Sequence, residues 1–129
     1  MPFEVDQIDH VEVFVRDIEA SVQWYAKVLG LKEIYRWDPA PVMIGAGDTK
    51  LALFRAAEDA EPPTCSKPGT PLRWRLVAWR TTAEGFQRAQ DHLAACGVPF
   101  DGPIDHETAK SIYFADLDGH PLEITYYLD

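Results

Sequence analysis

His10 and Glu123 are the two side chains of this sequence that are best suited to chemistry. Imidazole and carboxylate groups bind divalent metals, and they also exchange protons with a substrate. Glu12 follows His10 by two residues, so in a strand both side chains share one face. A catalytic metal usually has three protein ligands and one open position, so Glu12 or water would have to complete the set. The alternative is that His10 forms a hydrogen bond with Glu123 or Glu12 and binds no metal.

Aromatic and cationic residues form a second group of candidates. Phe14, Phe54 and Trp74 could supply flat apolar walls for a planar ligand, although aromatic residues at strand positions are often plain core. Arg80 and Arg36 could attract an anionic group, but arginines at strand ends are commonly solvated. We therefore expect a ligand role for the aromatic residues and for Arg80.

A strand and a helix position the first group of candidates. Residues 8–15 alternate, with Val11, Val13 and Val15 on an aliphatic face and the side chain of His10 on the other. Asp17 can cap a helix that ends at Gly30. Three short strands follow, at 31–37, 42–44 and 50–55.

The second half of the chain repeats this order. A strand over 73–80 precedes a capping-box spacing at Thr81 to Glu84 and a helix that stops at Gly97. Three more strands follow, at 98–104, 110–115 and 121–127. His106 falls in a turn and reads as a surface residue. The sequence thus predicts one domain, 1–129, built from two βαβββ modules at 5–55 and 72–129, with a linker at 56–71.

This pattern predicts an α+β fold with two curved mixed sheets. One helix protects only one face of each four-stranded sheet, so we expect the open faces to meet around a shared cavity. His10, Glu12 and Phe14 would line the cavity in the first module. In the second module the lining would come from Trp74, Leu76, Ala78 and Arg80. The modules could pair within a chain or across a dimer.

Composition excludes several classes of partner. Lys and Arg number 12 against 21 Asp and Glu, which gives a net charge of −9. That charge disfavours nucleic acid and anionic membranes. We expect a cytoplasmic protein with no membrane segment, since residues 1–6 have neither a basic leader nor an apolar stretch. Cys65 and Cys96 lie in unlike contexts and predict two reduced thiols.

The paired modules, the opening Ile8-Asp9-His10-Val11 and the closing residues 113–124 together resemble the vicinal oxygen chelate superfamily. This superfamily includes glyoxalase I, bleomycin-resistance proteins and extradiol dioxygenases. In its metal-using members, ligands come from the first strand of each module and the last strand of one or both. By this resemblance His10 and Glu123 match two ligand positions, whereas Leu76 and Ala52 stand at two others.

The resemblance leaves two functional hypotheses. The first is a protein that binds a small organic molecule in the cavity, with a degenerate metal site because Leu76 replaces the second histidine. The alternative is a lyase, isomerase, transferase or dioxygenase that uses Zn, Ni, Mn or Fe and acts on vicinal oxygens. In that case His10 and Glu123 would be both metal ligands and catalytic residues. Either protein is expected to be a homodimer with a small-molecule ligand.

Overall fold

The computed structural model describes residues 1–63 and 72–128, which form two compact units. The first unit is Met1–Ala60 and the second is Glu61–Asp129. Each unit has the element order βαβββ, as the sequence predicts. Cys65 and part of the expected linker lie outside the described residues. The shared cavity between the modules stays a prediction, as do the module boundaries.

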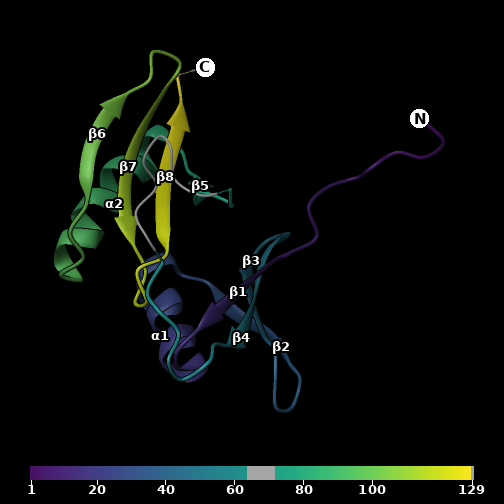
Figure 1. Cartoon of the computed structure of the whole chain (residues 1–129). Helices are drawn as coiled ribbons and strands as arrows, with labels where there is room; N and C mark the ends of the chain where they lie inside the picture. The colour runs from purple at the N-terminus through teal and green to yellow at the C-terminus, as the bar shows by residue number, and fades with distance from the viewer. Residues whose placement is uncertain (64–71, 129) are drawn as a thin grey trace. The chain divides into compact units, whose positions relative to one another are not determined.

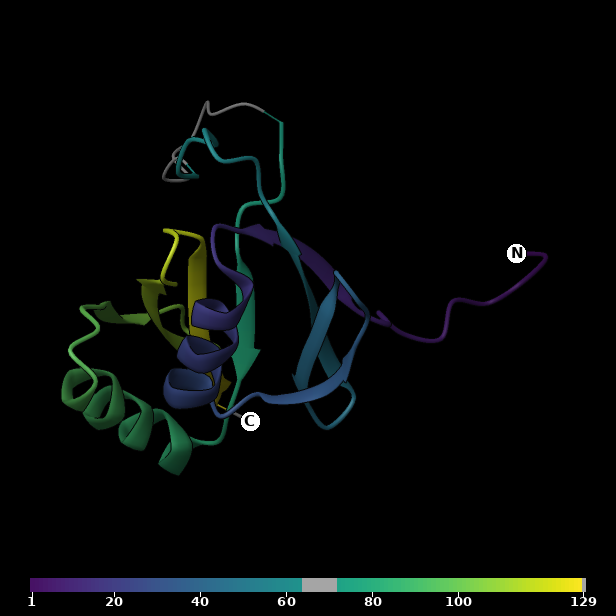
Figure 2. The same cartoon turned by 90° about the horizontal axis from the view of Figure 1, so that it is seen from below.

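The first unit is a four-stranded mixed sheet with one helix (Figure 1). Its elements are β1 (Val11–Val15), α1 (Ile18–Leu29), β2 (Lys32–Arg36), β3 (Val42–Ala46) and β4 (Thr49–Arg55). The strand order is β1-β4-β3-β2, with β1 parallel to β4 and the other pairs antiparallel. Strands β2, β3 and β4 therefore form the expected meander (Figure 2).

The ends of α1 follow the predicted caps. The Asp17 carboxylate accepts a hydrogen bond from the Ala20 backbone N–H at 3.0 Å, which satisfies one of the free donors of the first turn. Gly30 ends the helix at a φ of 71°, a left-handed conformation that glycine adopts without steric cost. Two local signals thus set both ends of the helix.

Helix α1 packs against β2, β3 and β4, and the core lies between them. Its buried members include Tyr25 on the helix and Val15, Ile44 and Leu53 on the strands. Phe14 remains 65% exposed, so the aliphatic side of β1 faces the helix as predicted. The strand begins at Val11 rather than Ile8. Residues 1–10 form neither helix nor strand, and the N-terminal end of this segment extends away from the sheet of this unit (Figure 1).

The second unit repeats the architecture. Its elements are β5 (Val77–Arg80), α2 (Ala83–Ala95), β6 (Asp101–Asp105), β7 (Ala109–Ala115) and β8 (Pro121–Tyr127). The strand order is β5-β8-β7-β6, again with the first strand parallel to the last. Helix α2 packs on β8, where the rings of Phe86 and Tyr126 lie 4.9 Å apart.

Three local expectations for this unit were wrong. Strand β5 starts at Val77 instead of Arg73, so Trp74 lies outside the sheet and is 96% exposed. Strand β6 starts at Asp101 because the Val98 backbone N–H still bonds to the Leu93 carbonyl and completes the helix end. The N-cap of α2 is Thr82, which bonds the Gly85 N–H at 3.0 Å, and glycine has no side chain to complete a capping box.

The strand registers of the two units are equivalent. Glu12 on β1 pairs with Ala52 on β4, and Ala78 on β5 pairs with Glu123 on β8. The two pairs are therefore equivalent positions of the two units. Among the described residues, no helix is long and apolar enough to cross a membrane.

Candidate functional site

His10 lies just before β1 between two carboxylates of its own unit. Its Nδ1 is 2.8 Å from Asp9 Oδ2 and its Nε2 is 3.0 Å from Glu12 Oε2. Lys50 Nζ on β4 holds the other oxygen of Asp9 at 3.3 Å. The hydrogen bond to Asp9, followed by that to Glu12, raises the pKa of His10 above its ordinary value. The same contact with His10, together with Lys50, lowers the pKa of Asp9.

These contacts decide how well His10 suits a metal. Both ring nitrogens face carboxylate oxygens, so these two contacts favour the protonated ring, which has no lone pair for a cation. The other expected ligand, Glu123, belongs to the second unit, and Leu76 and Ala52 have no donor atoms. Among the described residues, no three His, Cys, Asp or Glu side chains form a group that could hold a metal. The donor set within each unit therefore does not fit a catalytic divalent metal.

Phe14 and Phe54 lie together on the open face of the first sheet. They are register partners on β1 and β4, and their ring centroids are 6.1 Å apart with a 53° tilt. Ala52 is buried on β4 next to Glu12 of β1. The two rings are thus neighbours on one surface, as the predicted aromatic wall requires.

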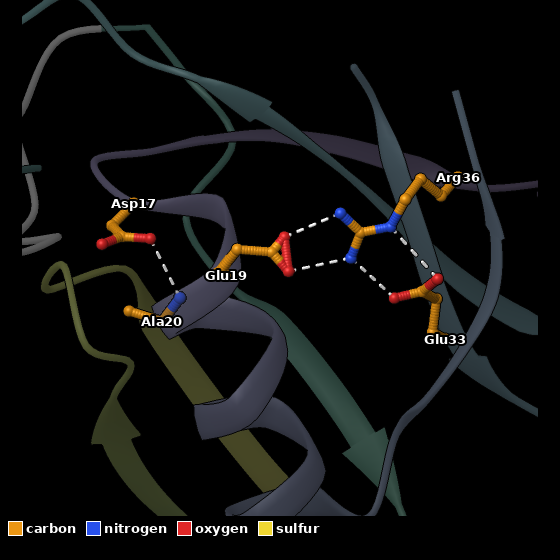
Figure 3. A network of polar contacts seen from close by, with 5 residues as sticks. All are labelled: Asp17, Glu19, Ala20, Glu33 and Arg36. Atoms are coloured by element: carbon orange, nitrogen blue, oxygen red, sulfur yellow. Dashed lines mark hydrogen bonds and ion pairs between the residues drawn. The ribbon is translucent and has the colours of Figure 1, made fainter. Parts of the chain in front are cut away.

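Arg36 is not available to a ligand. Its guanidinium makes a bidentate contact with Glu19 of α1, with N···O distances of 2.7 and 2.8 Å, and two further bonds with Glu33 of β2 at 2.8 and 3.2 Å (Figure 3). These bonds lower the pKa of both carboxyls. The residue connects the helix to the sheet instead of attracting an anion.

The second unit contains a groove of about 900 Å³, which is within the size range of small-molecule sites. Most of its walls are apolar, from β6, β7, the start of β8 and the segments around residues 76 and 99–100. The lining residues include Leu76, Ile104, Tyr113, His106, Asp101, Arg75 and Asp116. Leu76, the residue at the missing ligand position, is therefore part of an apolar wall.

Inside this groove His106 and Tyr113 are hydrogen bonded. The distance from His106 Nε2 to Tyr113 Oη is 2.8 Å, and the two rings meet edge to face at 90°. A tight turn fixes the histidine, because its backbone N–H bonds to Ala109 O at 2.8 Å and its carbonyl accepts from Thr108 N at 2.9 Å. Within the turn, Glu107 adopts a φ of 73°.

Tyr113 stands in a row of side chains that crosses the second sheet. It is the register partner of Asp101 on β6 and of Glu123 on β8, and Glu123 is in turn the partner of Ala78 on β5. Partners in neighbouring strands point to the same face. Glu123 therefore shares a face with the groove tyrosine.

Sequence reasoning missed His106, Tyr113 and Asp101 as site residues. His106 is exposed, as expected of a turn residue, but it also lines the groove. Alternation along 109–115 could have placed Tyr113 on the open face. The partnership with His106 depends on the turn geometry, for which the sequence carries no signal. Of the other two candidates in this unit, Arg80 packs its guanidinium 4.8 Å from the Tyr127 ring centroid, and Trp74 is exposed.

Comparison with known proteins gives one family and several relatives. The family described as Glyoxalase/Bleomycin resistance protein/Dioxygenase superfamily matches residues 7–124. A manganese-dependent 2,3-dihydroxybiphenyl 1,2-dioxygenase from Geobacillus genomosp. 3 is 30% identical over 98% of this chain, which spans 38% of that protein. The glutathione transferase FosA from Serratia marcescens is 28% identical, with 93% of this chain and 80% of that protein covered.

Solved structures share the fold. A glyoxalase/dioxygenase from Nostoc punctiforme has a TM-score of 0.79 at 24% identity, covering 95% of this chain and 92% of that one. TnmS3, an antibiotic binding protein from Streptomyces sp. CB03234, has a TM-score of 0.71 at 18% identity, covering 97% and 98%. Both likenesses support the α+β architecture of two four-stranded mixed sheets with two helices.

Proposed function

This chain belongs to the glyoxalase/bleomycin resistance protein/dioxygenase superfamily, and from that membership we propose that it binds a small organic molecule without a resident metal. The observation that carries the proposal is the groove of the second unit. Its volume of about 900 Å³, its apolar walls and its few hydrogen-bonding groups are typical of small-molecule sites. The structural likeness to an antibiotic binding protein agrees with a binding role.

The donor chemistry supports the absence of a metal from the mechanism. His10 contacts two carboxylates, at 2.8 and 3.0 Å, which favour its protonated ring, and the Leu76 side chain has no donor atom to offer a metal. Binding would instead rely on burial of apolar ligand surface, which contributes about 25 cal/mol per Å². His10, Glu12 and Glu123 then act as charged groups on the open sheet faces, while Phe14 and Phe54 offer an aromatic surface.

The binding test uses 2-methoxynaphthalene, a neutral planar probe, in equilibrium dialysis with and without EDTA. We expect saturable binding that EDTA leaves unchanged. Ile104→Glu places a charge in the groove wall and should weaken binding at least about tenfold, because the charge would be partly desolvated by the ligand. Ile34→Glu is the matched control, since Ile34 is an exposed isoleucine on a strand of the first unit, 50% exposed against 42% for Ile104.

Each result discriminates between the hypotheses. Binding that is lost in Ile104→Glu and kept in Ile34→Glu supports the groove. Equal loss in both variants, or no saturable binding by the wild type, contradicts the proposal. Binding that needs Zn, Ni, Mn or Fe and disappears with EDTA would favour the alternative, a metal-dependent enzyme like the manganese-dependent relative.

We also propose that the protein is a homodimer, as the sequence predicts. Large apolar side chains such as Phe14, Tyr35 and Trp37 are 65%, 57% and 46% exposed in the first unit, and apolar surface of this kind is commonly buried by association. Sedimentation velocity measures the state directly. A single monomeric species across the micromolar range would refute the dimer.

A further inference from the structure

We propose that the groove of the second unit selects ligands that donate a hydroxyl hydrogen bond, through a chain from the ligand O–H to Tyr113 Oη and from Tyr113 Oη to His106 Nε2. This inference rests on the proposed function, because it names the ligand chemistry of the same groove. The ligand class is a neutral, largely apolar molecule with a phenolic or alcoholic hydroxyl.

The direction of the chain depends on which ring nitrogen of His106 carries its proton. A phenol has one proton and two lone pairs, and a neutral imidazole has one donor nitrogen and one acceptor nitrogen. His106 Nε2 lies 2.8 Å from Tyr113 Oη, and in the imidazole tautomer that carries its proton on Nδ1 this nitrogen accepts the phenol proton. Tyr113 Oη is then left with lone pairs only. A ligand that meets this oxygen must supply the proton itself.

Charges around the tyrosine exclude the opposite class of ligand. Asp101 and Glu123 are its register partners on either side and share its face, and Asp116 also lines the groove. Arg75 is a lining cation, and it is already engaged in an interaction of its own. Two of the lining side chains are carboxylates and one is an arginine, a balance that disfavours an anion, since like charges repel most strongly where water is scarce.

The two residues of the chain have different roles. Tyr113 would contact the ligand, whereas His106 acts through Tyr113 and is a positioning residue. Hydrogen bonds in such a chain polarise one another, so the ligand bond is strengthened when the histidine accepts. The turn that holds the histidine backbone keeps its ring in place before the ligand arrives.

Two probes that differ in one group test this chemistry. 2-Naphthol donates a hydroxyl proton, and 2-methoxynaphthalene has the same rings and an oxygen that only accepts. Both dissociation constants are measured by equilibrium dialysis in the same buffer. A net hydrogen bond corresponds to a preference for 2-naphthol of about 3- to 10-fold. The readout is the ratio of the two constants, which a general loss of packing would not change.

Variants separate the two roles. Tyr113→Phe removes only the hydroxyl oxygen and should bring the ratio to about one. His106→Phe removes the acceptor and leaves the tyrosine proton free for the ligand, so the preference should shrink or reverse. His106→Gln restores an acceptor oxygen and should recover most of the preference. Tyr35→Phe, at an exposed tyrosine of the first unit, is the matched control and should keep the wild-type ratio.

The outcomes distinguish this inference from the proposed function. Equal binding of both probes by the wild type, or a preference that survives in Tyr113→Phe, overturns the hydroxyl selection and leaves the binding function standing. Failure of both probes to bind overturns both proposals. A preference that disappears in Tyr113→Phe and returns in His106→Gln supports the chain of hydrogen bonds.

Discussion

Ile112 precedes Tyr113 on β7 and belongs to the core of the second unit, so its truncation tests how much that core stabilises the unit. Its side chain on β7 is fully buried and is the register partner of Ile124 on β8. Ile112→Ala removes three carbon atoms, which corresponds to about 2.4 kcal/mol of lost transfer free energy at about 0.8 kcal/mol for each carbon. The cavity left behind adds to this loss. We therefore expect the free energy of unfolding to fall by about 3 to 4 kcal/mol.

Urea denaturation followed by circular dichroism measures this loss. With a denaturant dependence of about 1.5 kcal/mol per molar urea, a loss of 3 kcal/mol moves the midpoint down by about 2 M. Ile104→Ala is the matched control, because this isoleucine is 42% exposed on the neighbouring strand β6 and its removal leaves no enclosed cavity. The control should lose about 1 kcal/mol or less. If Ile104→Ala lowers the free energy of unfolding as much as Ile112→Ala does, the assignment of Ile112 to the core of the second unit is wrong.

Further predictions concern charge, metal content and backbone strain. Arg36 lowers the pKa of both its carboxyl partners, so these ion pairs stabilise the fold at neutral pH, and the stabilisation is lost as the pH falls below about 4.5. The melting temperature of the wild type should therefore fall more steeply between pH 6 and 3 than that of Arg36→Gln. Equal slopes would contradict this prediction. The raised pKa of His10 stabilises the fold below pH 6.5, and this contribution disappears as the pH rises through the folded-state pKa. A titration by NMR should show that pKa falling in Asp9→Asn, and an unchanged value would rule out the carboxylate as its cause. Elemental analysis of protein purified without chelator should give well below one metal per chain in the wild type, in His10→Ala and in Glu123→Ala. One metal per chain in the wild type that is lost in both variants would refute metal-free binding. Glu107→Asn should raise the free energy of unfolding by about 0.5 kcal/mol, because asparagine tolerates the left-handed conformation better; a loss in urea denaturation would show that the glutamate side chain makes a compensating contact.

Much of the fold was predictable because its signals are local. The Asp17 cap and Gly30 define α1, and the alternation along Val11, Val13 and Val15 places β1 with its aliphatic side toward the helix. The errors lie where one residue serves two elements, as at Val98, whose N–H completes a helix end instead of starting a strand.

The candidate site was less predictable because its contacts join distant or unlike residues. His10 and Glu12 were correctly paired, since two residues apart on an extended chain face the same side. The role of Asp9 was not foreseen, because alternation places its side chain on the opposite face from His10, and residues 8–10 are not in the strand. Arg36 gave no sign of its two carboxylate partners, one of which is 17 positions away. His106 and Tyr113 depend on a turn whose shape is set by backbone hydrogen bonds.

The parallel pairing of the first and last strands within each unit has a consequence for the order of folding. It joins Val11 to Leu51 and Val77 to Leu122, roughly 40 residues apart, whereas the hairpins β3–β4 and β7–β8 join close neighbours in the sequence. Closing a long loop costs more chain entropy before any contact repays it, so distant pairings form slowly. We expect β1 and β5 to dock last in their sheets, after the hairpins have formed. Pulse-labelling hydrogen exchange would then show that amides of β7 and β8 are protected before those of β5. Until β1 and β5 dock, the newly made protein would expose the unpaired edges of β4 and β8.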